Sequence, residues 1–516
     1  MTETDIINAK ITYNGRGRSN IDITKSILDE WRNREKAQNI RNMLDAEEYY
    51  MCRNIAISKK TRDMPGAGTN QTLSNIKMPS AFLRTNVTQK SDYALGKPFL
   101  LSVESPLTET LDEAGNPIED ANATLYLDEW TKYLSDDRRK TIKRIGKLGA
   151  INKGIGWAYI TIDADGDLTI QHVDSEQIYP AWTDKEHTAL DAVVRDYKVI
   201  QFINNNREEV KKVEYWDASQ VYRFIDKGQG SIALEPDPDS SQPIAHMELS
   251  DNGITWGKVP FIFFKGNEDE LPMLNIIRAQ IDSYDKLQSK SVDALLDDID
   301  PVLALKGYSP ELGSLVEQRQ IMQSSRIVAI GENGDAYYVQ TKPDITAVQE
   351  KLESLKKDIR EFGASVDTQD IRFGSNPSGV ALKSMYTDLD VYSNGLETEF
   401  SAFMQLLKYF FDRWLEFRRI GTAEQWKQYE ISVKFDRDLM TNSTSDIQEA
   451  VMLASTGVSQ QTIDNWNPAV PSHEIEQQRR EREAATRLDG MDIERKLAEL
   501  REVNERLTRE QNNDEV

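Results

Sequence analysis

One uninterrupted run of apolar residues dominates the second half of the chain. From Leu382 to Phe417, apolar residues recur every three or four positions without a break. That spacing marks one face of an α-helix and predicts a helix over 379–420, about 60 Å long at 1.5 Å per residue, with Ser378 as its N-cap. Asn394-Gly395 lies inside the run, and glycine in a helix costs about 1 kcal/mol relative to alanine. We therefore expect a long helix with a kink at this dipeptide.

Shorter segments with the same periodicity alternate with runs of β-branched and aromatic residues. Helices are predicted over 23–50, 81–95, 124–150, 271–299 and 344–362. A hairpin is predicted over 156–173, around Asp165-Gly166. Further strands are predicted over 191–204, 210–216, 219–225, 258–265 and 429–437. The pattern of residues 301–341 predicts a strand, a short helix and a hairpin that turns at Asn333-Gly334. The fold class is therefore α+β.

Charge and length limit the classes of function. The chain has 516 residues, enough for about three domains, and its formal charge is 63 − 86 = −23. Proteins that grip DNA through its phosphates normally present a basic face, so this is not an ordinary DNA-binding domain. An acidic surface suits a conduit along which DNA slides. Neither a signal peptide nor an apolar run long enough to cross a bilayer is evident, so we expect the protein to be made and used in a cytoplasm, with no membrane partner.

A search for catalytic and metal-binding motifs finds little. Cys52 is the only cysteine, which excludes an internal disulfide and a cysteine zinc site, and we expect it to be a packed core thiol rather than a nucleophile. The four histidines are scattered, and there is no Walker or nucleophile-elbow motif. Asp163-x-Asp165-Gly-Asp167 lacks the offsets of an EF-hand, and FGSNPSG is a weak phosphate-loop signal. We predict no catalytic residue, no metal site and no cofactor.

Four segments, in this order, resemble the portal proteins of long-tailed bacteriophages. They are NIKMPSAFLRTNVTQKSDYALGKPFLLSVE, LGAINKGIGWAYITIDADGDLTIQHVDSEQIYPAW, GKVPFIFFKGN followed by IDSYDKLQSKSVDALLDDIDPVLALKGY, and IRFGSNPSGVALKSMYTDL. The resemblance covers about 25–480. It implies a ring of twelve subunits at one capsid vertex, each with wing, stem, clip and crown regions.

The resemblance divides the chain into a mixed α/β wing, a two-helix stem, a small α/β clip, a long kinked helix and a helical crown. The assignments are 1–24 flexible arm, 25–270 wing, 271–299 stem helix, 300–343 clip, 344–363 stem helix, 364–378 tunnel loop, 379–420 long wing helix, 421–440 wing strand, 441–485 crown and 486–516 charged tail.

Three groups of residues are candidates for contact with DNA or partners. In the tunnel loop they are Gln369, Asp370, Arg372, Phe373, Ser375 and Asn376. In the stem, Lys286 and Lys290 share one helix face, as do Lys356 and Arg360, and we expect them to line the channel. The alternative is that these cations pair with Asp282, Asp293 or Glu353 between subunits. In the clip, Glu311, Glu317 and Arg319 are expected to bind partners, the alternative being that the clip only braces neighbouring subunits.

The expected function is a portal protein that forms a DNA channel for genome packaging, retention and ejection. Its expected partners are copies of itself in a dodecamer, double-stranded DNA, the terminase packaging motor, a head–tail adaptor, and capsid and scaffolding proteins. It would reside in the virion at the portal vertex and in the host cytoplasm during assembly. The alternatives are a nucleic-acid-processing enzyme of the phage particle and another structural protein of the capsid or baseplate.

Overall fold

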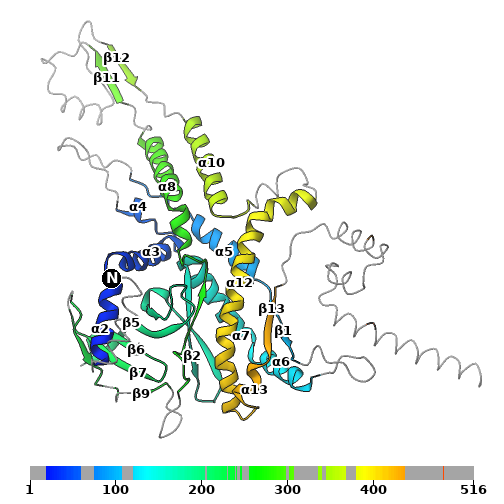
Figure 1. Ribbon diagram of the computed structural model, residues 1–516. Helices are drawn as coiled ribbons and strands as arrows, with labels where there is room; N and C mark the ends of the chain where they lie inside the picture. The colour runs from blue at the N-terminus through cyan, green and yellow to red at the C-terminus, as the bar shows by residue number, and fades with distance from the viewer. Residues whose placement is uncertain are drawn as a thin grey trace, which may run out of the picture. The chain divides into compact units, whose positions relative to one another are not determined.

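The structure is a computed structural model that describes residues 19–59, 75–106, 120–203, 206–228, 231–238, 240, 244–246, 255–297, 302–306, 335–339, 345–367 and 379–435, with residues 452 and 480. The chain divides into two units, Met1–Asp367 with Asp388–Arg437, and Thr368–Thr387 with Asp438–Val516. Of the second unit, the described residues are the first turns of one helix and residues 452 and 480. Everything below on packing concerns the first unit, drawn as ribbons in Figure 1.

Four helices begin the described chain: α2 (Asn20–Trp31), α3 (Arg34–Tyr50), α4 (Ile55–Ser58) and α5 (Phe82–Leu95). The single helix expected over 23–50 is wrong, because Arg32 and Asn33 break it and the backbone of Asn33 is extended. Helix α2 starts at Asn20, inside the segment assigned to the flexible arm. Ile23, Ile27 and Leu28 of α2 are buried against the large sheet, which explains why this part is ordered.

The expectation that Cys52 is a core thiol in a helix is also wrong. Cys52 is half-buried, follows the end of α3 and has a φ of 58°. The N–H of Cys52 donates to Tyr49 O and that of Arg53 to Glu48 O. This is the Schellman arrangement, in which the residue after the helix takes a left-handed conformation that glycine adopts most easily.

The helix predicted over 124–150 is three helical segments. They are α6 (Ala121–Tyr133), α7 (Asp136–Arg144) and the π-helical segment η1 (Ile145–Ile151). The break falls at Leu134-Ser135, where the guanidinium groups of Arg138 and Arg139 donate to the carbonyls of Tyr133 and Leu134. The Tyr133 carbonyl also accepts the N–H of Ser135, so both carbonyls at the end of α6 have donors in place of the next helical turn.

The predicted hairpin is confirmed as β2 (Ile155–Ile162) and β3 (Leu168–Val173), which β10 (Phe261–Lys265) extends to a three-stranded antiparallel sheet. Asp163 Oδ1 accepts N–H bonds from Asp165 and Asp167, so this aspartate shapes the turn. A Cβ on Gly149 would lie 2.3 Å from Gly156 Cα. The glycines of LGAINKGIG therefore let η1 and β2 touch backbone to backbone.

The largest sheet is antiparallel and six-stranded, in the order β4-β5-β6-β7-β8 with β9 also on β7. Its strands are β4 (Ile178–Trp182), β5 (Leu190–Ile203), β6 (Asn206–Trp216), β7 (Gln220–Asp226), β8 (Leu234–Pro236) and β9 (Ile244–Ala245). The IYP of one of the four resembling segments, residues 178–180, starts β4. The strands predicted within 191–225 are confirmed with small shifts at their ends.

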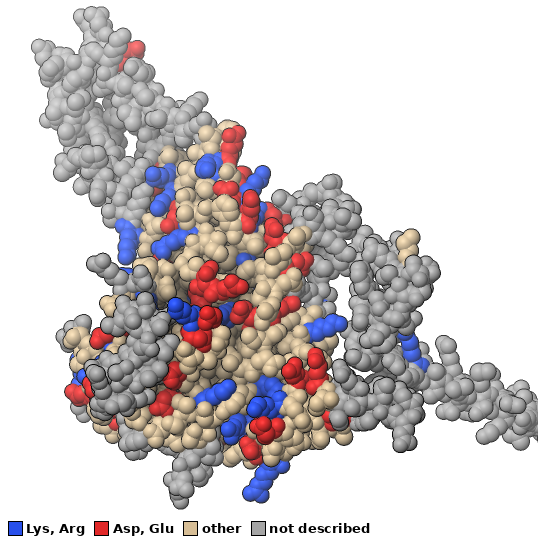
Figure 2. Space-filling view, in the orientation of Figure 1, with Lys and Arg blue, Asp and Glu red and all other residues tan. Residues whose placement is uncertain are grey.

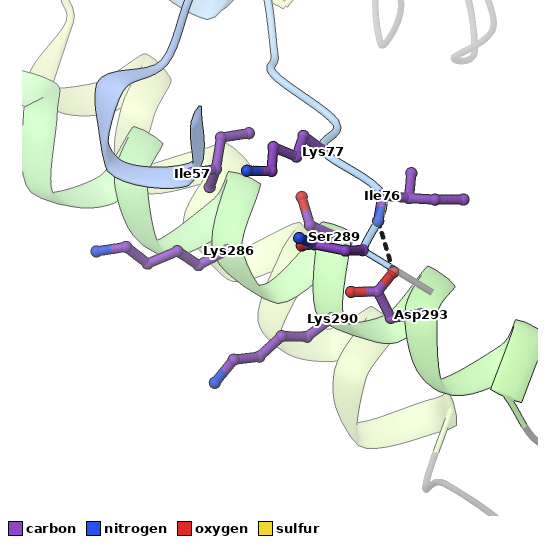
Figure 3. Close-up of a pocket in the computed structure, with 8 residues that line it drawn as sticks. Ile57, Ile76, Lys77, Lys286, Ser289, Lys290 and Asp293 are labelled. Atoms are coloured by element: carbon purple, nitrogen blue, oxygen red, sulfur yellow. Dashed lines mark hydrogen bonds between the residues drawn. The ribbon is translucent and has the colours of Figure 1, made fainter. Parts of the chain in front are cut away.

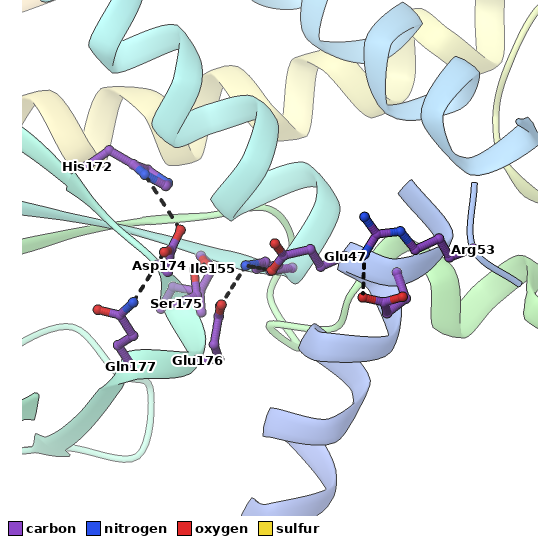
Figure 4. A network of polar contacts seen from close by, with 10 residues as sticks. Glu47, Arg53, Ile155, His172, Asp174, Ser175, Glu176 and Gln177 are labelled. Carbon is purple, nitrogen blue, oxygen red and sulfur yellow. Dashed lines mark hydrogen bonds and ion pairs between the residues drawn. The ribbon is translucent and has the colours of Figure 1, made fainter. Parts of the chain in front are cut away.

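A buried lysine joins the helices to the sheets through two glutamates, Glu47 and Glu176, which are labelled in Figure 4. Lys153, which follows η1, donates to Glu47 on α3 at 2.9 Å and to Glu176 at 2.6 Å. Glu176 belongs to η2 (Ser175–Gln177), a 3-10 turn between β3 and β4. Burial alone would lower the pKa of Lys153, but the carboxylates of Glu176 and Glu47 outweigh burial and raise it.

The long predicted helix is confirmed as α12 (Gly379–Phe417). Its C-terminal half carries the centre of the main core, with Phe400, Phe403, Leu407, Phe411 and Leu415 all fully buried. The helix continues through Asn394-Gly395, and the kink expected there stays a prediction. Beyond α12, α13 (Ala423–Lys427) leads to β13 (Glu430–Lys434), which pairs with β1 (Leu100–Glu104). The strand predicted over 429–437 is thus confirmed, and β1 was not predicted.

Two further helices, α8 (Met273–Asp297) and α10 (Ile345–Phe362), confirm the segments predicted over 271–299 and 344–362. Figure 1 shows them side by side and running in opposite directions. Between them, β11 (Val302–Lys306) pairs with β12 (Asp335–Val339) in an antiparallel ladder. No helix in the described part of the chain is both long and apolar enough to span a bilayer.

Candidate interface on the α8–α10 helix pair

Helix α8 changes the character of its buried face halfway along its length. Ile277 and Ile281 are fully buried in the main core. One, two and three turns later, the residues covered from solvent are Asp285, Ser289 and Asp293, each four positions after the last. Residues four apart lie on the same side of a helix. The helix therefore presents an apolar face followed by a polar one.

The polar face of α8 binds residues 76–80, which lie just before α5. Asp293 Oδ1 accepts the N–H of Ile76 at 2.8 Å, Ser289 Oγ that of Met78 at 3.1 Å, and Asp285 Oδ1 that of Ser80 at 3.0 Å. Four helical residues rise about 6 Å and two extended residues about 6.6 Å, so the two repeats stay nearly in register. We call these three bonds the polar ladder.

Asp285 is the most enclosed member of the polar ladder. Its side chain also accepts a 2.7 Å hydrogen bond from Asn54 Nδ2, which begins α4. Burial raises the pKa of Asp285, although the hydrogen bonds from Asn54 and Ser80 work in the opposite direction. The polar ladder was not predicted. The spacing Asp285-x3-Ser289-x3-Asp293 was a signal for it, but the partner segment could not be deduced from α8 alone.

Lys286 and Lys290 lie beside the polar ladder and are exposed to solvent. They border a cavity of about 240 Å³ whose other walls are Ile57, Asn75, Ile76, Lys77, Ser289 and Asp293. In Figure 3 the two lysines point away from α8 on the same side of the helix. Within the described part of the chain, no carboxylate lies within 4 Å of either ammonium group. Their expected common face is therefore present.

The two residues of the other predicted cation pair, on α10, have different surroundings. Lys356 is half-buried, whereas Arg360 forms an ion pair with Asp367 just past the end of the helix. Asp367 belongs to the short segment that follows α10, and Val366 in that segment exchanges two 3.1 Å hydrogen bonds with Gln89 of α5. Residues 364–367, assigned to the tunnel loop, are thus bound to α5 and α10.

The remaining candidate contacts lie outside the described residues. These are Gln369, Asp370, Arg372, Phe373, Ser375 and Asn376 of the tunnel loop, and Glu311, Glu317 and Arg319 of the clip. The N-cap expected at Ser378 and most of the crown and the charged tail fall there as well.

Among the described residues, no group of three or more His, Cys, Asp or Glu could hold a metal ion. Three of the histidines contact nearby residues. His187 Nδ1 lies 2.7 Å from Glu270, His246 Nε2 lies 2.9 Å from Asp217 O, and His172 Nδ1 lies 3.9 Å from Asp174. Burial lowers the pKa of both His172 and His246.

Comparison with known proteins finds one family whose sequence pattern matches most of the chain, including this helix pair. The SPP1 Gp6-like phage portal protein family matches residues 29–488, which include both helices of the pair and the strands between them. The chain belongs to this family. The family to which the sequence pointed is confirmed.

Two curated relatives carry the same description. The portal protein of Bacillus phage SPP1 is 25% identical over 488 residues, covering 93% of this chain and 90% of the relative. The portal protein of Clostridium phage phiCD119 is 25% identical over 335 residues, covering 61% of this chain and 68% of the relative. The match to SPP1 is therefore close to full length in both proteins.

Two solved structures are more distantly similar. The neck of a native GTA particle, computed with C12 symmetry, matches 74% of this chain and 88% of its own with 12% identity and a TM-score of 0.35. An HK97-family phage portal protein from Corynebacterium diphtheriae matches 68% of this chain and 92% of its own with 9% identity and a TM-score of 0.30.

Proposed function

We propose that this chain assembles into a closed ring, a dodecamer by analogy with its family, whose channel carries double-stranded DNA through one vertex of a phage capsid. The observation that carries the proposal is the family match over residues 29–488. It favours a portal over the alternatives, a nucleic-acid-processing enzyme or another capsid or baseplate protein. The ring would serve genome packaging, retention and ejection.

The assignment of regions follows from this function. Helices α8 and α10 would form the stem, and the β11–β12 pair between them would belong to the clip. The sheets, α2 to α7, the second half of α12 and β13 would form the wing, and residues 441–485 the crown. The tunnel loop would begin after Asp367, because residues 364–367 are bound to α10 and α5.

The partners would be those that a portal needs. The clip, through Glu311, Glu317 and Arg319, would bind the terminase packaging motor during assembly in the host cytoplasm and a head–tail adaptor later. Capsid and scaffolding proteins would contact the ring at the vertex. The role is structural, without a cofactor or turnover, and the net charge of −23 favours sliding of DNA over tight binding.

Negative-stain electron microscopy of the purified full-length protein tests the proposal. We expect closed rings with a central channel, because a heterologous interface whose rotation closes produces a ring. A protein that remains monomeric at micromolar concentration across a range of salt would contradict it. Deleting residues 368–375 should leave rings intact and abolish DNA packaging, and normal packaging by that variant would remove the tunnel loop from the proposal.

A further inference from the structure

We propose that the exposed lysines of α8, Lys286 and Lys290, dock against the exposed acidic face of α10 in a second copy of this chain, through Glu350, Glu353 and Glu361. We call these two surfaces the lysine strip and the acidic strip. The inference rests on the proposed ring and names the surfaces that close it.

The two strips lie on different helices, each along one face. A helix turns about 100° per residue, so Lys286 and Lys290 lie about 40° apart around α8. Glu350, Glu353 and Glu361 lie within about 80° of one another around α10, and the exposed Lys357 lies among them. The lysine strip is therefore basic, and the acidic strip, with three glutamates and one lysine, keeps a net negative charge.

Each strip carries charges that its own chain does not neutralise. Lys286 and Lys290 are exposed, as are Glu350, Glu353 and Glu361. Across the described ranges, none of the five has an oppositely charged group within 4 Å. In Figure 2, Lys and Arg side chains lie along the edge of the surface over α8, while Asp and Glu predominate toward α10. The strips are thus complementary in charge.

The acids closest to the lysines in sequence are already engaged. Asp282 accepts the hydroxyl of Tyr49 at 2.5 Å, and Asp293 is buried and accepts the N–H of Ile76 in the polar ladder. Of the three acids that the sequence suggested as partners between subunits, Glu353 is the one whose side chain is exposed. This points to α10, not α8, as the partner helix.

The lysine strip also allows a second helix to approach closely. Toward the start of α8 it continues through Ser283, Ala279 and Ile276, all of them exposed and the first two small. These positions and the lysines are spaced three or four apart, which forms one stripe along the helix. Because the lysine strip of one copy meets the acidic strip of the next, the contact is heterologous. In an open chain of subunits, each end has one strip without a partner until the ring closes.

Charge reversal and exchange in the full-length protein test the proposal. Lys286→Glu with Lys290→Glu should raise the protein concentration at which half of the subunits are in rings at least tenfold, measured by mass photometry. Adding Glu350→Lys and Glu353→Lys to that variant should restore assembly to within about threefold of the original, because the pairs are re-formed with opposite polarity. Raising NaCl to about 1 M, where the Debye length is about 3 Å, should weaken the original rings.

The control carries the same change in charge at exposed lysines elsewhere. Lys140→Glu with Lys185→Glu alters α7 and the loop before β5, far from both strips in sequence, and should leave assembly unchanged. Thermal unfolding followed by circular dichroism checks that every variant is folded. If the reversal variant is unfolded, the neutral Lys286→Gln, Lys290→Gln pair replaces it, with a smaller expected shift in the same direction.

Two results would overturn the inference while leaving the portal function in place. Rings that form normally in the reversal variant but package no DNA would place the lysines in the channel. Rings lost on reversal and not restored by the exchange would mean that the partner of the lysine strip is not α10. Failure of the unmodified chain to form rings would instead overturn the proposed function itself.

Discussion

Charged side chains on the large sheet and those of the two strips on the α8–α10 pair differ in their partners. On the sheet, Asp226 is nearly enclosed and contacts Arg32 and Lys211, and Glu214 contacts Arg195 and Arg223. On the helix pair, Lys286, Lys290, Glu350, Glu353 and Glu361 are exposed and find no ion pair in the described part of the chain. Ion pairs within one chain stabilise its fold, whereas exposed charges that form no ion pair are available to a partner.

The junction where α5 meets α8 and α12 buries charge in a third way. Lys90 is 1% exposed, and its ammonium group lies 3.5 Å from the centre of the Tyr392 ring and 3.4 Å from Met273 Sδ. No carboxylate among the described residues lies within 4 Å of it. The aromatic face attracts the ammonium group but does not replace its lost hydration. Burial therefore lowers the pKa of Lys90 to about 7.

The largest effect should come from replacing this lysine. The folded pKa lies below the value of 10.5 for an exposed lysine, so stability is lost as pH falls from about 10.5 to about 7. Lys90→Met removes that loss and should raise the free energy of unfolding at pH 7 by roughly 3–5 kcal/mol. Urea unfolding at pH 7 and at pH 10.5 checks this, and the gain should nearly vanish at the higher pH. An equal gain at both values would show that packing, not charge, is responsible.

A smaller effect on stability should distinguish charges that form ion pairs within the chain from exposed charges that form none. Asp226→Ala leaves Lys211 and Arg32 without one of their counterions and should lower the free energy of unfolding by about 3 kcal/mol. Lys290→Ala is the matched change at an exposed charge without an ion pair and should alter the free energy of unfolding by less than about 0.5 kcal/mol. Urea unfolding of both variants makes the comparison. Equal losses of unfolding free energy would mean that Lys290 already stabilises the helix pair within one chain and is not held for a partner.

Asp226 also predicts how the sheet responds to acid. Burial raises the pKa of Asp226, but N–H bonds from Ala233 and Gly228 and the ammonium of Lys211 outweigh it, so the net pKa is lowered. Its contribution to stability is thus complete above the unfolded pKa and is lost as pH falls through the folded one. The stability difference between the original protein and Asp226→Ala should therefore narrow below about pH 4.

The smallest effect concerns backbone conformation at the end of α10. Ala364 has a φ of 42°, and the N–H of Ser365 donates to Arg360 O, so Ala364 takes the left-handed position of a Schellman motif. Ala364→Gly should raise the free energy of unfolding by about 1 kcal/mol, because glycine adopts this conformation without strain. Thermal unfolding measures it.

The neighbouring glycine supplies the control. A Cβ on Gly363 would lie 2.6 Å from Asn86 Nδ2 and 2.5 Å from Ile359 O, so Gly363→Ala should destabilise the protein. If Ala364→Gly were instead destabilising and Gly363→Ala neutral, the helix would end one residue earlier than the structure has it.

Much of the architecture was predictable from the sequence, and the parts that were share one property. Helices α5, α8, α10 and α12 and the β2–β3 hairpin are each specified within a single stretch of chain, by periodicity and turn residues. The common face of Lys286 and Lys290 follows from the same local geometry. The family, too, could be recognised from the order of four short segments.

The tertiary structure alone decided the features that depend on distant partners. Strand β1 exists because β13 pairs with it, and neither the Leu134-Ser135 break nor the left-handed conformation of Ala364 follows from periodicity. The polar ladder requires both α8 and residues 76–80, whose spacings match only when the two are laid side by side. Local sequence determines which conformation a segment prefers, but hydrogen bonds and charges between segments depend on which groups the fold brings within reach.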